Sequence, residues 1–317
     1  MQGAASLEPG GRDALVVIGN FDGVHRGHQE LLHEATTRSL SAGLQPRVLT
    51  FSPHPAEALG RSAPPVLTPV DRKAELLREH FPAVEVVVQP FDGQFAAKSP
   101  EQFAEFLRQS LGAREVMVGQ NFRFGQGRAG DFARLRELGA SLGFEARAIQ
   151  LQGDARGTWS STRVRQSLAS GDLEDANALL GRPHEMEGTV EHGQHRARTL
   201  GFPTANLGGV VQARPANGVY AVRAWRIEAG APALLGGGVA NIGVRPTVAA
   251  GFAIEAHVFD FTGDLYGSRV RLQLVARLRD ERTFGSIDEL RTQIGQDSAT
   301  ARAILAASGP REGAPPS

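Results

Sequence analysis

The sequence of 317 residues contains no cysteine, so disulfide bonds, thiolate metal sites and a cysteine nucleophile are all excluded. Lysine is nearly absent as well, because only Lys73 and Lys98 occur among the 34 basic residues. Phosphate contacts are therefore expected from arginine, whose planar guanidinium binds phosphate through two hydrogen bonds, although a GC-rich genome alone gives the same bias. No Gly-Lys pair is present, which excludes a P-loop.

Excess charge of one sign and long apolar runs are also missing. The formal net charge is zero, so no general attraction to nucleic acid or to a membrane surface is expected. No apolar run approaches the roughly 18 residues that a membrane-spanning helix needs, and residues 1–11 lack the basic and apolar segments of a secretory signal. We therefore expect a cytoplasmic enzyme without nucleic-acid or membrane partners, and the composition leaves a homo-oligomer open.

Residues 15–182 alternate between apolar runs and amphipathic segments, which predicts an α/β domain with a doubly wound parallel sheet. The predicted strands are 14–21, 47–51, 84–88, 115–119 and 144–149. Helices are expected over 28–42, over 71–79 with Asp71 as the N-cap, and from Ser99 with Pro100 in the first turn. Two short helices over 161–180 would close this unit.

The pattern changes after Gly181-Arg182-Pro183. Residues 186–275 contain short strand-like runs separated by Gly, Pro and Asn, which predicts an antiparallel barrel. An amphipathic helix is expected over 286–305, and the Pro/Gly-rich end over 309–317 is expected to be disordered. We therefore predict two domains, 1–182 and 183–317.

The run GNFDGVHRGH (19–28) joins the first predicted strand to a helix. His25 and His28 at a helix N-terminus are suited to donate hydrogen bonds to phosphate oxygens. Nucleotidyl transfer builds charge on the α-phosphate, so donors placed there in advance lower the barrier. The alternative is that one histidine lies at the surface and the other caps the turn.

SSTRVR (160–165) begins a helix after the last predicted strand. Ser161 and Thr162 suit the helix N-terminus, and Arg165 follows one turn later. Helix capping explains the two hydroxyls alone. It does not explain why they occur with Arg165 and an HxGH motif at the ends of parallel strands.

Together these segments resemble the HxGH and STxxR motifs of the nucleotidylyltransferase superfamily. With TFSPHP (50–55) and VGQNFRFGQGRAGDF (118–132), residues 15–182 resemble the FMN adenylyltransferase half of bacterial FAD synthetases. The resemblance implies that Asn121, where many members have Asp, contacts the nucleotide or the FMN phosphate. It implies an ATP and phosphate site formed by Gly19, Phe21, Asp22, Gly23, His25, Gly27, His28, Ser161, Thr162 and Arg165.

Two segments of the second domain carry chemistry. In GFPTANL (201–207), Thr204 and Asn206 offer oxygen ligands suited to Mg²⁺, although a proline-containing loop with local turns is the alternative. In IEAHVFDF (254–261), strand alternation places Glu255 and His257 on one face. A carboxylate at the barrel mouth is suited to act as a general base, and a solvated outward-facing Glu is the alternative.

GTVEHGQHRARTLGFPTANL (188–207), NGVYAV (217–222), ANIGVRPT (240–247) and EAHVFDFTGDLYG (255–267), with the terminal helix, resemble riboflavin kinase across 185–305. The resemblance implies a six-stranded barrel with riboflavin under its loops, Mg-ATP at Thr204 and Asn206, and Glu255 as general base. It adds Arg198, Gly201 and Pro203 to the ATP and riboflavin site. The sequence departs from the family pattern at Ala197, usually Gly, and at Val248, often Phe.

The two resemblances match successive steps of one conversion. We therefore expect a bifunctional enzyme that phosphorylates riboflavin to FMN and adenylylates FMN to FAD, with ATP as co-substrate and Mg²⁺ as cofactor. A nucleotidylyltransferase for another substrate does not account for the barrel. A flavin-binding regulator with degenerate sites would be indicated by loss of His28, Arg165 or Glu255, and all three are present.

Overall fold

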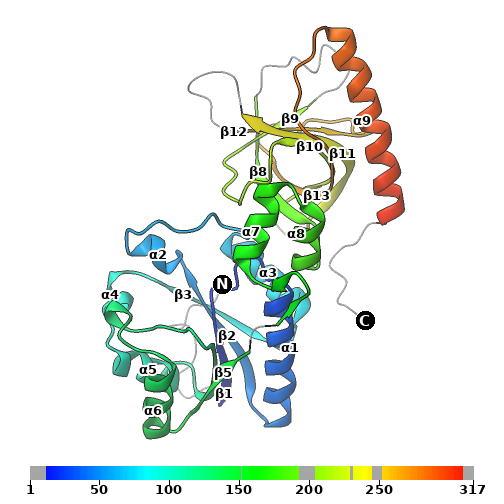
Figure 1. The fold of residues 1–317 in the computed structure, drawn as a ribbon. Helices are drawn as coiled ribbons and strands as arrows, with labels where there is room; N and C mark the ends of the chain where they lie inside the picture. Colours follow the sequence, from blue (N-terminus) through cyan, green and yellow to red (C-terminus); the bar gives the residue numbers. More distant parts are fainter. Residues whose placement is uncertain (1–11, 151, 193–203, 229–230, 245–251, 310–317) are drawn as a thin grey trace. The chain divides into compact units, whose positions relative to one another are not determined.

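The computed structural model describes residues 12–150, 152–192, 204–228, 231–244 and 252–309 (Figure 1). Within them, no helix is both long and apolar enough to cross a membrane. The predicted site residues Arg198, Gly201 and Pro203 lie outside these ranges, as do Ala197, Val248 and most of the C-terminal end. The chain forms two compact units, and each is described by itself.

The first unit runs to Pro64 and from Thr68 to Ser160, and its centre is a five-stranded parallel sheet. The strands are β1 (Ala14–Ile18), β2 (Gln45–Ser52), β3 (Glu85–Pro90), β4 (Ala113–Gly119) and β5 (Glu145–Ile149). Their order is β3-β2-β1-β4-β5, so the chain reverses direction across the sheet between β1 and β4. Ligands of doubly wound folds bind at the carboxyl ends of strands at such a point.

Helices cover both faces of this sheet, as the strand and helix alternation predicts (Figure 1). One face packs on α1 (Arg26–Ser41) and α3 (Val70–His80), and the other packs on α4 (Gly93–Ala96), α5 (Pro100–Gln109) and α6 (Phe132–Leu142). Every residue of β1 is buried, with Leu15 and Val17 in one core cluster and Ala14, Val16 and Ile18 in the other. The remaining short elements of the unit are α2 (Pro55–Ala58), a 3₁₀ turn (Gln126–Arg128), β6 (Gly153–Asp154) and β7 (Gly157–Thr158).

The first residues of the helices confirm the predicted cap of α5 and correct the predicted starts of α3 and α1. Ser99 caps α5 in a capping box with Gln102, and Pro100 is the first helical residue, as predicted. The prediction of Asp71 as N-cap was wrong, because Pro69 takes that position and Asp71 lies in the first turn of α3. Helix α1 begins two residues before its predicted start at 28, which places His28 in the first turn rather than at the cap.

The second unit contains Pro65–Leu67 and the chain from Ser161, and its first elements are α7 (Ser161–Ser170) and α8 (Leu173–Leu180). The compact unit therefore begins before the predicted domain boundary at residue 182. The reason is a set of contacts to the barrel strands. Asn177 Nδ2 donates to the carbonyl of Leu274 over 2.9 Å, and Asn177 Oδ1 accepts from the backbone N–H of His184 over 2.8 Å.

The body of the second unit is a closed antiparallel barrel of six strands in the order β10-β11-β12-β9-β8-β13, as the sequence pattern and the resemblance predict. These strands are β8 (His184–Glu191), β9 (Ala205–Gly208), β10 (Gly218–Arg226), β11 (Ala233–Val244), β12 (Phe252–Val258) and β13 (Arg269–Arg279). Side chains fill the interior, among them the fully buried Met186, Tyr220, Ile242 and Leu272. The interior of a small barrel is typically filled by side chains in this way.

The terminal helix α9 (Ile287–Ser308) packs against the outside of the barrel (Figure 1). Its Ser286 N-cap accepts a hydrogen bond from the backbone N–H of Glu289. Ala301 and Leu305 pack against Val219, Ala221 and Val239. The predicted helix over 286–305 is confirmed, and its apolar stripe covers one side of the barrel.

Burial of His184 makes the stability of the second unit depend on pH. His184 is 2% exposed and its Nε2 lies 2.9 Å from the carbonyl of Ala213. Burial lowers the pKa of His184 to about 4, from 6.5. The unfolded chain therefore takes up a proton between these pH values that the folded chain does not, so stability is complete above pH 6.5 and is lost as the pH falls toward 4.

We predict that the free energy of unfolding of this unit falls by about 3 kcal/mol through that protonation. Calorimetry across this pH range measures the loss. His184→Gln keeps an N–H donor of similar size but cannot be protonated, so its unfolding should depend less on pH than that of the unaltered chain. Equal pH dependence in both proteins would contradict the assignment to His184.

Candidate active sites

The turn between β1 and α1, residues 19–25, has an unusual backbone. Phe21 and Val24 adopt left-handed φ angles of 50° and 42°, and Gly23 has a φ of 88°. Left-handed backbone at a non-glycine residue is uncommon and costs about 1–3 kcal/mol. Both side chains are buried, with 1% and 0% exposure, in the core cluster beside α1. Their burial therefore holds the β1–α1 turn in this conformation.

Two glycines allow the rings of the β1–α1 turn to pack closely. A Cβ on Gly19 would lie 3.1 Å from the ring of Phe21. A Cβ on Gly27 would lie 3.0 Å from the Trp159 carbonyl oxygen and 3.2 Å from the ring of His25. The spacing of the HxGH motif thus has a steric reason, because a side chain at Gly27 would displace His25.

The structure brings His25 and His28 together at the N-terminus of α1, as the motif predicts. Their rings stack with centroids 3.7 Å apart, and the ring of Phe21 lies 5.0 Å from that of His28. His25 is the N-cap residue, and the first turn of α1, which is fully described, contains no acidic residue. The positive end of the helix dipole is therefore not neutralised locally.

The imidazole of His28 stays neutral near pH 7. Its pKa is lowered well below 6.5, first by burial and then by the charges of His25 and Lys73. Nδ1 of His28 is shielded from solvent and has no hydrogen-bond partner within the described part of the chain. A neutral imidazole still carries one N–H, so His28 remains a donor without exchanging a proton.

A buried lysine lies beneath the β1–α1 turn, and its role was not predicted from the sequence. Lys73 on α3 is 6% exposed, and its Nζ donates to the Asn20 carbonyl over 2.8 Å and to Thr50 Oγ1 over 3.0 Å. The available signal was its place on the apolar stripe of that helix, four residues before Leu77.

Residues from neighbouring strands complete this edge of the sheet. Asn121 is exposed in the turn directly after β4, the strand beside β1 where the sheet order reverses. Phe51 lies near the end of β2, Phe91 follows β3 and Phe122 follows Asn121. These three phenylalanines are partly buried against the core, and Phe51 meets Phe91 edge-on at 5.6 Å. This aromatic group was not predicted, because its members are far apart along the chain.

The other predicted phosphate ligands lie in the second unit. Ser161 and Thr162 are the first residues of α7, which confirms the predicted helix start. Arg165 follows one turn later, and its Nε donates to the Pro65 carbonyl over 2.7 Å. His25 and His28 belong to the first unit, so their joint use with Ser161, Thr162 and Arg165 stays a prediction.

In the barrel, the pairing of three neighbouring strands places three polar side chains in one row. Glu255 on β12 lies directly opposite Asn206 on β9 and Asn241 on β11. Residues directly opposite in an antiparallel pair project to the same face. We call Asn206, Glu255 and Asn241 the polar row. Asn206 is buried, whereas Glu255 is half-buried.

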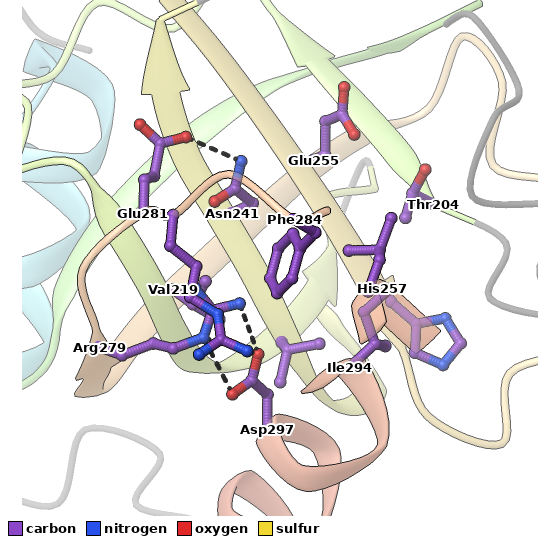
Figure 2. Close-up of a pocket in the computed structure, with 13 residues that line it drawn as sticks. Thr204, Val219, Asn241, Glu255, His257, Arg279, Glu281, Phe284, Ile294 and Asp297 are labelled. Atoms are coloured by element: carbon purple, nitrogen blue, oxygen red, sulfur yellow. Dashed lines mark hydrogen bonds and ion pairs between the residues drawn. The ribbon is translucent and has the colours of Figure 1, made fainter. Parts of the chain in front are cut away.

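A cavity of about 280 Å³, lined by Glu255 and Asn241 of the polar row, lies between the outer face of the barrel and α9 (Figure 2). Glu255, His257 and Thr204 line it, and the predicted alternation of β12 is confirmed by the burial of Ile254, Ala256 and Val258. Glu255 faces the cavity from the outer face of β12, and its expected role at the barrel mouth stays a prediction. The cavity also has an apolar wall, formed by Val219, Val239, Phe284, Leu290 and Ile294.

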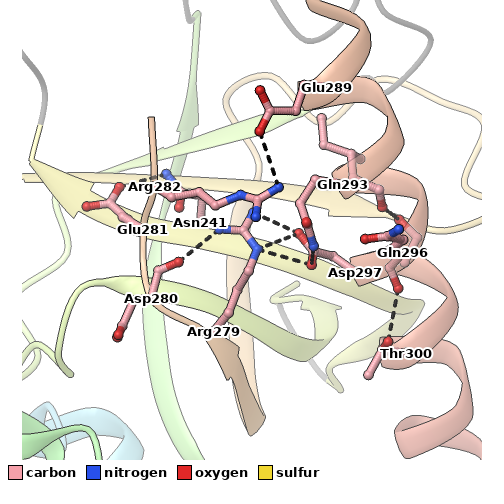
Figure 3. Close-up of polar contacts among 12 residues, drawn as sticks. Asn241, Arg279, Asp280, Glu281, Arg282, Glu289, Gln293, Gln296, Asp297 and Thr300 are labelled. Atoms are coloured by element: carbon pink, nitrogen blue, oxygen red, sulfur yellow. Dashed lines mark hydrogen bonds and ion pairs between the residues drawn. The ribbon is translucent and has the colours of Figure 1, made fainter. Parts of the chain in front are cut away.

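Ion pairs fix the far end of the cavity, and they were not predicted from the sequence (Figure 3). Arg279 on β13 donates to both carboxylate oxygens of Asp297 on α9, over 2.8–3.1 Å. Asn241 of the polar row donates to Glu281 over 3.1 Å. Arg279 and Asp297 therefore attach α9 to the barrel, and Glu281 orients one end of the polar row.

Comparison with known proteins finds two families, one matching each of the two parts of the chain that hold these candidate sites. The sequence matches the family model described as FAD synthetase over residues 8–163 and the one described as riboflavin kinase over residues 180–305. A relative from Escherichia coli strain K12, named bifunctional riboflavin kinase/FMN adenylyltransferase, is 40% identical over 91% of each chain. A relative of the same name from Pseudomonas fluorescens is 38% identical over 98% of this chain and 99% of its own.

A crystal structure with a similar fold is that of a protein from Streptococcus pneumoniae named as a macrolide-efflux protein. It is 29% identical, with a TM-score of 0.79, and the match covers 95% of this chain and 97% of that one. That name belongs to the streptococcal protein, and the fold is what the two chains share. Given the identity and coverage of the bifunctional relatives, this chain belongs to the bifunctional riboflavin kinase/FMN adenylyltransferase family.

Proposed function

We propose that this protein phosphorylates riboflavin to FMN with one ATP and then transfers AMP from a second ATP to FMN, giving FAD and pyrophosphate. The observation that carries this proposal is that one chain holds two separate clusters of polar groups suited to group transfer, one in each compact unit. The first is the stacked His25 and His28. The second is the polar row around Glu255. The family matches follow the same order along the chain.

In the adenylyl transfer, an FMN phosphate oxygen attacks the α-phosphorus of ATP and the bond to the pyrophosphate oxygen breaks. Charge develops on the α-phosphate oxygens, and donors already in place stabilise it. We assign that role to His25 and His28, beside the N–H groups at the start of α1. The remaining phosphate contacts are assigned, from the STxxR motif, to Ser161, Thr162 and Arg165.

The β1–α1 turn shapes the nucleotide site through Gly19, Phe21, Asp22, Gly23 and Gly27. Asn121, at the end of the neighbouring β4, is assigned to the nucleotide or the FMN phosphate. The exposed parts of Phe51, Phe91 and Phe122 at the same edge are suited to contact the flavin ring. This assignment places the reacting phosphates where the order of the strands reverses.

In the kinase reaction, the 5′-hydroxyl of riboflavin attacks the γ-phosphorus of ATP and the bond to the ADP oxygen breaks. The hydroxyl proton passes to the carboxylate of Glu255, which acts as general base. Glu255 lines the cavity together with Thr204, so the base and a candidate Mg²⁺ ligand face the same space. The apolar wall opposite, with Phe284 and Ile294, suits the riboflavin ring.

ATP-dependent transfer in this family typically uses a divalent metal, and we propose Mg²⁺ at Thr204 and Asn206. A hydroxyl and an amide oxygen are hard ligands that fit Mg²⁺. Asn206 is 7% exposed and adjoins Glu255, so its amide is held in the polar row. The metal would neutralise phosphate charge, while the protein side chains orient the phosphates toward the attacking hydroxyl.

We further propose that residues 1–182 form the adenylyltransferase domain and residues 183–317 the kinase domain. We also propose that the enzyme acts in the cytoplasm, and the neutral net charge supports the absence of nucleic-acid binding. Riboflavin, FMN, FAD and ATP are the expected ligands. Incubation of the protein with riboflavin, ATP and Mg²⁺, followed by chromatography, tests the whole proposal. FMN and FAD should both form, and absence of either product would remove the corresponding activity.

His28→Ala should lower the rate of FAD formation from added FMN by roughly 10²-fold or more, because it removes a donor to the transition state. Riboflavin phosphorylation should continue at the rate of the unaltered enzyme. His33→Ala, on the exposed face of the same helix, is the matched control and should leave both rates unchanged. Near-normal FAD formation by His28→Ala would show that the HxGH motif is not the phosphate site.

Glu255→Gln should lower the kinase rate roughly 10²- to 10⁴-fold, since the amide keeps the size of the side chain but cannot accept the proton. Riboflavin and ATP should still bind, and FMN adenylylation should not change. Asp260→Asn is the matched control, because Asp260 is paired with Arg302 at the surface. A kinase rate equal to that of the unaltered enzyme would reject Glu255 as the base, and a loss through affinity alone would make it a binding residue.

A further inference from the structure

Lys73 is costly to bury. Its neighbours on the buried face of α3 are Ala74, Leu76 and Leu77, and the ammonium group lies inside the unit rather than at its surface. An ammonium taken out of water loses several kcal/mol of solvation unless its donors are satisfied. An apolar residue would fill this space without that penalty, so packing alone does not explain a lysine here.

The contacts of Lys73 are directed at the β1–α1 turn. The Asn20 carbonyl accepts from Lys73 Nζ over 2.8 Å and from Thr50 Oγ1 over 3.1 Å. Asn20 directly precedes Phe21, whose φ of 50° is the first left-handed angle of the turn. The two donors therefore fix the orientation of the peptide group at which the strained conformation begins.

The segment that contains Lys73, residues 68–73, also contacts the β1–α1 turn at Asp22. Oδ1 of Asp22 accepts a hydrogen bond from the backbone N–H of Thr68 over 2.9 Å, just before α3. Asn20 and Asp22 flank Phe21, so residues 68–73 support the turn on both sides of it. Displacement of this support would allow the turn to relax, and the histidines that follow would move with it.

Lys73 also supplies charge near the paired histidines. Burial lowers the pKa of Lys73 to about 8, while the charge of Asp22 opposes that shift, so the ammonium is mostly protonated at pH 7. The charged or titratable groups that act on His28 are His25 on its own helix and Lys73 on α3. A buried cation thus lies close enough to the neutral His28 to lower its pKa.

We propose that Lys73 is a positioning residue for adenylyl transfer, which holds the β1–α1 turn through the Asn20 carbonyl and keeps a buried positive charge next to that turn. The proposal rests on the adenylyltransferase activity proposed above for this unit. It assigns to α3 a part in the reaction, which Lys73 plays through the backbone of the turn.

Lys73→Met tests the proposal, because methionine approaches the length of the side chain but has neither charge nor donor. The kcat for FAD formation from FMN should fall roughly 10- to 100-fold, the scale of a displaced catalytic group. The pKa of His28, followed by NMR with the signal assigned through His28→Gln, should rise because a neighbouring cation is gone. Riboflavin phosphorylation in the other unit should not change, and neither rate should change in Lys98→Met, the matched lysine control.

Thr50→Val is the second variant, which keeps the charge of Lys73 and replaces one hydroxyl by a methyl group in a side chain of the same shape. It should lower FAD formation by a smaller factor and leave the pKa of His28 unchanged. If Lys73→Met fails to fold, a Thr50→Val enzyme with the rate of the unaltered protein overturns the proposal. A folded Lys73→Met enzyme with normal FAD formation or an unshifted His28 also overturns it. If the unaltered protein makes no FAD from FMN, the proposed function fails instead.

Discussion

The left-handed backbone at Phe21 and Val24 is the constraint on which the first site depends. Both residues are buried, so their packing in the core holds the turn in this shape. The turn then sets where α1 begins and makes His25 its N-cap, which stacks His25 on His28. Strain of this kind persists only where the surroundings over-determine it. Here the surroundings are two buried side chains and the hydrogen bonds from Lys73 and Thr50.

In the barrel, the register of the strands determines where the polar side chains of the second site lie. Because Asn206, Glu255 and Asn241 lie on three neighbouring strands, a slip of one residue would turn Glu255 to the other face of its strand. Side chains fill the interior, and the cavity lies on the outer face, where residues of α9 line it. Arg279 and Asp297 hold that helix in place through a bidentate ion pair. The charges are largely buried, so removing one partner would leave the other uncompensated.

Most of the architecture could be predicted from the sequence because it rests on local periodicity. The apolar run of β1, the capping box of α5 and the alternation in β12 are each visible within a few residues. Motifs with fixed spacing, such as His25 with His28, were visible for the same reason. The error at Asp71 arose because an acidic residue is favoured both at the N-cap and in the first turn of a helix. In the structure Pro69 is the N-cap and Asp71 lies in the first turn.

What could not be predicted depends on contacts between distant segments. Lys73 contacts Asn20 across 53 positions of the sequence, and the phenylalanines at the sheet edge come from three separate strand ends. The start of the second compact unit at Ser161 follows from the contacts of α8 with the barrel, and the composition changes only later. Such features follow from tertiary packing and have no local pattern.

The central claim is that one chain uses two different phosphates of ATP for two successive transfers. The most direct measurement follows riboflavin with ATP labelled either at the γ-phosphate or at the α-phosphate, and separates the products by chromatography. The account predicts that γ-label appears first in FMN and then in FAD, whereas α-label appears only in FAD. Formation of FMN without any α-labelled FAD would contradict it. Formation of FAD while FMN never carries the γ-label would contradict it as well.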